Sequence, residues 1–260
     1  MRRVETLHNI LEIAKTSFYQ CGANGDRYIL ASLSRLITLS YQFDSANYSL
    51  LQAERLYRDK DSDEILSLYQ LQNSIISYCG CYDTLLEVLY FAFKFCKKLD
   101  DKEDFTEALK QCRWNVDGNA SHLSLKNNLE GLLPNDKIAA LIKKLDSFMN
   151  KSRQQVATLA NHLKHGGGLI TSKYATYISH IGYVNEKYIM TKGKKNNDVD
   201  IKFQAKSSFF DAEWLYPHII DIPMVIGQMY QQNEAIYKMV VYVYNLLGYD
   251  KLNDTIADNY

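Results

Sequence analysis

The chain has 260 residues, of which 47% are hydrophobic, and its 30 Lys and Arg residues balance 30 Asp and Glu residues. This composition is typical of a globular protein with a sizeable core, and a net charge of zero argues against a protein that coats nucleic acid through bulk positive charge. No run of about 18 apolar residues is present, so we expect no membrane-spanning segment. The amphipathic start of the chain is not typical of a signal peptide, and we expect a bacterial, cytoplasmic protein.

The cysteines follow no zinc-binding spacing, so we expect reduced thiols in buried or half-buried positions. They are Cys21, Cys79, Cys81, Cys96 and Cys112.

Apolar residues at spacings of three and four predict long helices in the first half of the chain. The pattern appears first at Ile29, Leu33, Leu36, Phe43 and Leu50. A longer ladder follows at Ile65, Leu68, Gln72, Ile75, Cys79, Tyr82, Leu86, Leu89 and Phe93, and Leu71, Tyr78 and Leu85 widen its apolar face. Asp61, Ser62 and Asp63 are suited to cap this helix. The polar stretch 97–125 predicts a helical elaboration with a loop at 114–118.

The second half of the chain contains two further helices and one change of period. A helix is predicted from the LPND sequence at 133–136 to about His165, where three glycines end it. Between residues 180 and 206 the apolar residues alternate in twos around a polar turn, which predicts a β-hairpin. The last helix carries Val225, Met229, Ile236, Val240, Val243 and Leu247. The sequence therefore predicts an all-α protein: one domain, 1–260, that forms a bundle of long up-and-down helices with an inserted hairpin near 180–206.

The sequence ATLANHLKHGGG, residues 157–168, contains the strongest candidate site. Asn161, His162, Lys164 and His165 lie within five positions at the end of a predicted helix, where the helix dipole favours a cation. Histidine can serve as an acid or base near neutral pH. The same residues also fit a polar helix end with a capping histidine. His162 and His165 have no acidic partner at a metal-ligand spacing, so we expect no metal and no cofactor.

The segment ANHLKHGG resembles the signature region of HEPN-type helical proteins, and the helix LQNSIISYCGCYDTLLEVLYFAF resembles their long tyrosine-bearing helix. The family signature is an arginine, then a polar residue, then a histidine four to six residues after the arginine. Asn161 and His165 match the last two, and Ala160 stands in the arginine place. The resemblance implies a helical bundle, a homodimer and, in active members, a metal-independent ribonuclease.

Three functions remain open at this stage. The favoured one is a HEPN-like protein that binds RNA or a protein partner without efficient cleavage, in a bacterial defence or toxin–antitoxin type system. This follows from Ala160, because no guanidinium would neutralise the scissile phosphate. The second is an active metal-independent endoribonuclease that uses His165, His162, Asn161 and Lys164. The third is an unrelated α-helical interaction module in which the histidines only cap the helix.

Other basic and aromatic residues are candidates for contact with RNA. Arg153 and Lys164 lie on the helix of the signature, and Lys194 and Lys195 lie in the predicted hairpin turn. Arg113 and Trp114 stand before a loop, where an aromatic ring can stack on a base. The aromatic-rich segment 209–218 is interpreted as a hydrophobic cover or a dimer contact.

Overall fold

The structure, a computed structural model, places most of its described residues in helices, which confirms the predicted all-α class. The description covers residues 3–21, 26–59, 63–96, 99, 122–165, 168–173, 188–192, 201–205 and 218–249. None of the helices in these ranges has the length and apolar content needed to cross a lipid bilayer.

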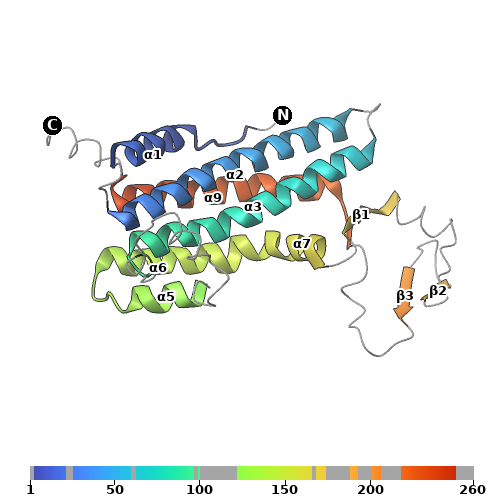
Figure 1. The fold of residues 1–260 in the computed structure, drawn as a ribbon. Helices are drawn as coiled ribbons and strands as arrows, with labels where there is room; N and C mark the ends of the chain where they lie inside the picture. Colours follow the sequence, from blue (N-terminus) through green and yellow to red (C-terminus); the bar gives the residue numbers. More distant parts are fainter. Residues whose placement is uncertain are drawn as a thin grey trace.

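Two long helices, α2 (Arg27–Arg58) and α3 (Glu64–Ala92), form the central pair of the bundle (Figure 1). Asp26 and Asp63 are their N-caps, and each carboxylate accepts a hydrogen bond from a main-chain N–H in the first turn. The caps satisfy N–H groups that no carbonyl of the helix can reach. The predicted start of the second helix is confirmed at Asp63.

The contacts between α2 and α3 show that the two helices are antiparallel. Ser67 Oγ donates a hydrogen bond to Ala53 O at 2.8 Å, and Ser32 Oγ donates to Val88 O at 2.9 Å. Each contact joins the start of one helix to the end of the other. Both serines are buried, so their hydroxyl groups are satisfied inside the pair.

Most of the predicted apolar ladder along α3 is buried from the second turn onward, whereas Gln72 and Phe93 are half-buried. Ile65, in the first turn, is 47% exposed. The buried members of the ladder are Leu68, Ile75, Cys79, Tyr82, Leu86 and Leu89, together with the adjoining Leu71, Tyr78 and Leu85. Because more than one face of α3 is apolar, the helix packs against α2, α7 and α9 at once.

Helix α1 (His8–Cys21) packs on α2, and helix α9 (Ile222–Leu247) packs on both α3 and α2. Helix α9 begins at Asp221, whose carboxylate accepts a hydrogen bond from Met224 N at 2.8 Å. It ends at Gly248, whose φ of 67° is a left-handed conformation that glycine adopts without strain. The predicted last helix is therefore confirmed.

The helix predicted from 133–136 to about His165 is present as three consecutive segments. They are α6 (Asp136–Ser147), the π-helical segment η2 (Phe148–Arg153) and α7 (Gln154–His165). Asn135 caps the start, and its side chain accepts hydrogen bonds from two main-chain N–H groups. The shorter α5 (His122–Glu130) packs beside α6. Residues 100–121, which include the predicted loop at 114–118, lie outside the described residues.

Two small sheets accompany the helices. Strands β2 (Tyr188–Lys192) and β3 (Ile201–Ala205) pair in antiparallel register, which confirms the predicted hairpin. Strands β1 (Leu169–Thr171) and β4 (His218–Ile220) pair in parallel, and the sequence did not predict this sheet. Gln72 on α3 donates a hydrogen bond to Leu169 O at 3.1 Å, so β1 lies at the end of the bundle where α3 begins and α7 ends (Figure 1).

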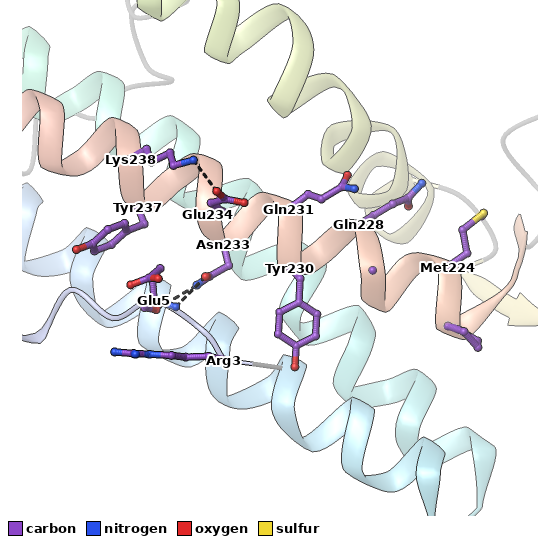
Figure 2. A pocket seen from close by; sticks show the side chains of 12 residues that line it. Arg3, Glu5, Met224, Gln228, Tyr230, Gln231, Asn233, Glu234, Tyr237 and Lys238 are labelled. Carbon is purple, nitrogen blue, oxygen red and sulfur yellow. Dashed lines mark hydrogen bonds and ion pairs between the residues drawn. The ribbon is translucent and has the colours of Figure 1, made fainter. Parts of the chain in front are cut away.

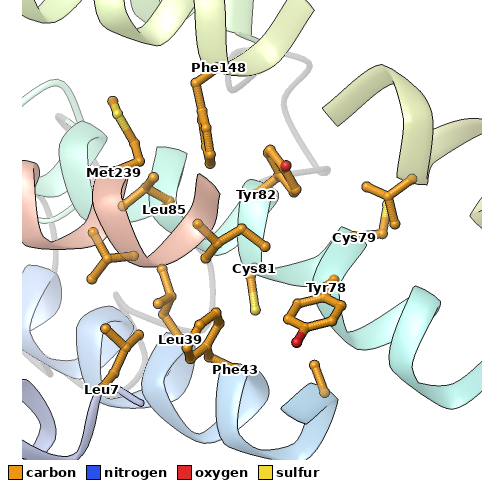
Figure 3. Packing of buried hydrophobic residues seen from close by; sticks show 14 of the residues in the cluster. Leu7, Leu39, Phe43, Tyr78, Cys79, Cys81, Tyr82, Leu85, Phe148 and Met239 are labelled. Atoms are coloured by element: carbon orange, nitrogen blue, oxygen red, sulfur yellow. The ribbon is translucent and has the colours of Figure 1, made fainter. Parts of the chain in front are cut away.

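Aromatic rings fill the centre of the bundle (Figure 3). Phe43 of α2 meets Tyr78 of α3 edge to face, with ring centroids 5.9 Å apart. Tyr82 of α3 stacks on Phe148 of η2 at 4.4 Å. One hydrophobic cluster therefore joins α2, α3 and the consecutive helical segments α6, η2 and α7. Cys79, Cys81 and Cys96 are free and buried, as predicted, whereas Cys112 and the side chain of Cys21 lie outside the described residues.

Candidate functional site

Helix α7 carries the predicted signature, and its buried face runs through Val156, Leu159 and Ala160. Ala160 occupies the arginine place of the HEPN-type signature. Its exposed fraction is 0%, and it belongs to the central hydrophobic cluster. The arginine place therefore points into the core and not toward a groove that an RNA phosphate can enter.

Asn161 and Lys164 lie on the solvent side of α7, and both are exposed. Three residues of α-helix turn through about 300°, which leaves these two side chains about 60° apart on one face. His165 is the last residue of α7, and its side chain lies outside the described residues. By helix geometry its Cα lies on the same face as that of Asn161.

His162 lies on a different face of α7 and stacks on His218 of β4. The ring centroids are 4.6 Å apart, and the planes are nearly parallel at 14°. Asn161 and Lys164 are 100° and 200° away around the helix from His162. The four predicted catalytic residues are thus divided between two faces, and His162 is engaged with the small sheet.

Arg153 is paired with Asp83 of α3 at 3.2 Å, with both side chains partly exposed. It lies eleven residues before Lys164, about 16 Å along the helix. Burial raises the pKa of Cys79 on α3, Asp83 raises it further, and Lys164 and Arg153 act in the opposite direction. Both cations are therefore near enough to Cys79 of α3 to act on its thiol.

The remaining predicted contacts with RNA lie outside the described residues. They are Lys194, Lys195, Arg113 and Trp114. Within the described residues, no group of three or more His, Cys, Asp or Glu side chains is arranged to hold a metal ion.

A groove lies between η2 and α7 on one side and β4 and the start of α9 on the other. It encloses about 560 Å³. Its polar lining residues are Asn150, Lys151, Gln154, Gln155, Thr158, His218 and Gln228. The sequence did not indicate this groove, because its two walls come from segments far apart in the chain that tertiary contacts, including the β1–β4 pairing, bring together.

A second groove lies between the N-terminal segment and α9, and its polar groups are largely engaged (Figure 2). The Asn233 side chain accepts a hydrogen bond from Glu5 N at 2.9 Å and donates to Glu5 O at 3.1 Å. Tyr230 Oη donates to Glu54 Oε2 at 2.6 Å. Lys238 pairs with Glu234 along α9. The Asn233 contacts fasten the N-terminal segment to α9, and the Tyr230 contact joins α9 to α2, so we interpret this groove as structural.

Comparison of the chain with family models, with curated proteins and with solved structures found no match. The residues of α7 and their surroundings are therefore the basis of the function proposed below.

Acidification is expected to weaken the packing of β4 on α7. Burial lowers the pKa of His218, and His162 lowers it further. With a folded-state pKa below the unfolded value of about 6.5, neutral His218 favours the folded protein above that pH, and this stability is lost as pH falls through the folded pKa. His122 contributes in the same direction, because burial lowers its pKa despite Asp146.

Urea unfolding between about pH 7.5 and pH 5 measures this dependence, since stability changes with pH wherever the folded and unfolded states bind different numbers of protons. We expect His218→Gln to lose less stability over this range than the wild type does. His122→Gln should remove a separate share of the dependence. If the free energy of unfolding of His218→Gln falls with pH as steeply as that of the wild type, the stacked His162–His218 pair does not contribute to the pH dependence.

Proposed function

We propose that this protein is a HEPN-like helical protein that binds RNA or a protein partner, as a homodimer, and does not cleave RNA efficiently. We place it in a bacterial defence or toxin–antitoxin type system. The resemblance of ANHLKHGG to the HEPN-type signature supports the family, and the helical bundle is compatible with it. The observation that carries the non-catalytic part is the burial of Ala160.

Burial of Ala160 bears on catalysis because an active site of this type needs a cation at the scissile phosphate. A guanidinium supplies two parallel hydrogen bonds to phosphate oxygens. Arg153 is held by Asp83, and Lys164 is a point charge on the solvent face. Loss of one such phosphate contact in the transition state is worth about 3 kcal/mol, or roughly a hundredfold in rate.

RNA cleavage by the purified protein, in the presence of a chelator, tests the proposal. We expect labelled single-stranded RNA to remain intact with the wild type and with His165→Ala. Fluorescence anisotropy with the same RNA then separates an RNA binder from a protein whose partner is another protein. Cleavage by the wild type that disappears in His165→Ala would contradict the proposal and support the ribonuclease alternative.

A further inference from the structure

The outer edge of β4 borders the groove between η2–α7 and α9. In the described part of the chain, β4 pairs with β1 alone. His218 N donates a hydrogen bond to Gly168 O at 2.9 Å. Main-chain groups alternate in direction along a strand, so the N–H and C=O of Ile219 point away from β1. Ile219 is 52% exposed and lines the groove.

An exposed strand edge is a template for another strand. The three residues of β4 span about 10 Å at the rise of an extended chain, so this edge matches a short extended segment.

The wall opposite β4 presents side-chain amides. Gln154 and Gln155 come from α7 and Asn150 from η2, while Gln228 of α9 adds one amide on the β4 side. An amide both donates and accepts hydrogen bonds, which matches the alternating N–H and C=O groups of a peptide backbone. The groove thus offers peptide-like partners on both of its long sides.

The amide of Gln155 is oriented by a chain of hydrogen bonds from the core. Tyr82 Oη donates to Gln232 Oε1, and Gln232 Nε2 donates to Gln155 Oε1 at 3.4 Å. Gln232 is buried between them. With its oxygen engaged, Gln155 has its Nε2 donors left to bind a carbonyl group in the groove. Pre-orientation of this kind lowers the entropy cost of binding.

The charge and the apolar surface of the groove indicate the composition of the bound segment. Among the described residues that line the groove are Lys151 and His218, and none of them is a carboxylate. Met224, which is 57% exposed, and Ile219 supply apolar surface, and the buried Val225 and Leu159 also border the groove. A single lysine is too little charge for a nucleic-acid backbone, whose binding depends on several phosphate contacts. An acidic peptide with apolar residues fits both features.

We propose that this groove binds an extended, acidic peptide segment of a partner protein, which adds as a strand to the outer edge of β4. The segment hydrogen-bonds to Ile219 on one side and to the amide row on the other, and it places a carboxylate at Lys151. The inference holds whether or not the chain is HEPN-like, because it uses none of the signature residues.

NMR of the full chain with ¹³C-methyl-labelled methionine tests this proposal. The probes are blocked pentapeptides of the form Glu-X-Thr-X-Glu, with X as Val, Ile, Leu or Phe, added to about 1 mM, a range that detects weak complexes. We expect the Met224 methyl signal to shift with at least one peptide, while the buried Met229 and Met239 serve as internal references. N-methylation of the central threonine should weaken binding about tenfold, by loss of one main-chain hydrogen bond.

Two pairs of variants locate the bound peptide. Ile219→Pro removes the outward N–H, a change that an edge strand tolerates, and it should abolish the shift, whereas Ile219→Val should bind as the wild type does. Lys151→Glu should also abolish it, and Lys143→Glu, on an exposed part of α6 outside the groove, should not. If Ile219→Pro fails to fold, the comparison of Lys151→Glu with Lys143→Glu tests the proposal.

Three results would overturn the proposal. The first is that none of the peptides moves the Met224 signal. The second is an equal shift from lysine-flanked peptides or from a uridine pentanucleotide. The third is binding that survives both Ile219→Pro and Lys151→Glu. The RNA-cleavage test of the proposed function uses other residues, so each proposal can fail alone.

Discussion

An arginine at position 160, which completes the HEPN-type signature in sequence, is expected to destabilise the protein and to leave it without ribonuclease activity. Ala160 has no exposed surface and packs in the central hydrophobic cluster. A guanidinium there must displace packed side chains and lose its hydration without a carboxylate partner. We expect the free energy of unfolding to fall by about 4 kcal/mol or more, as is typical of a buried unpaired charge. Chemical denaturation followed by circular dichroism measures the change.

Asn161→Arg is the matched control, because it adds the same side chain one residue further along, on the exposed face of α7. Its effect on unfolding should stay within about 0.5 kcal/mol, as for other surface substitutions. A stable Ala160→Arg protein that cleaves RNA in chelator would show that this face of α7 opens to solvent. The non-catalytic part of the proposed function would then be wrong.

The long helices could be predicted because their burial is one-sided and regular. The ladder from Leu68 to Leu89 repeats with the period of the helix, and the short side chains of Asp63 and Asn135 cap helix starts through purely local contacts. The hairpin at 188–205 was predictable for the same reason, since a period of two is also local.

The surroundings of the candidate site could not be predicted from local sequence patterns. Alanine carries little periodic signal, so the sequence did not show that Ala160 faces the core. His218 belongs to the aromatic-rich segment 209–218, which the sequence led us to interpret as a hydrophobic cover or a dimer contact. Its contact with His162 depends on the three-residue pairing of β1 with β4, which no local pattern indicates. Strands this short, joined across many residues, are recognised only once the helices are in place.

Buried polar residues inside the helices were also missed, because a polar residue in a helix is ordinarily interpreted as a surface position. Asn47 of α2, Asn233 of α9 and Gln232 of α9 are all buried. Each is satisfied by partners from other elements, so the reason for its burial is tertiary. The Asn47 cluster connects the N-terminal segment, α2, α3 and α9 at one point.

Asn47→Ala is expected to be among the most destabilising single substitutions in the bundle. The Asn47 side chain donates to Glu5 O at 2.8 Å, and its oxygen accepts from Tyr78 Oη at 2.7 Å and from Asn233 Nδ2 at 2.8 Å. Burial raises the pKa of Tyr78, so its hydroxyl stays protonated and needs an acceptor. Removal of Asn47 deprives two buried donors of this acceptor and Glu5 O of one of its donors. We expect the free energy of unfolding to fall by about 3 kcal/mol or more, since each unmet buried group costs about 1–3 kcal/mol.

Two comparisons separate this network from simple loss of volume. Tyr78→Phe removes one donor and leaves Asn47 bonded to Glu5 and Asn233, so it should cost only about 1 kcal/mol. Asn161→Ala makes the same side-chain change as Asn47→Ala on the exposed face of α7 and should be nearly neutral. Hydrogen exchange adds a local measure, because the amide of Glu5 bonds to Asn233 and should lose protection in Asn47→Ala. If Asn47→Ala unfolds at the wild-type denaturant concentration and Glu5 keeps its protection, the cluster does not hold the N-terminal segment on the bundle.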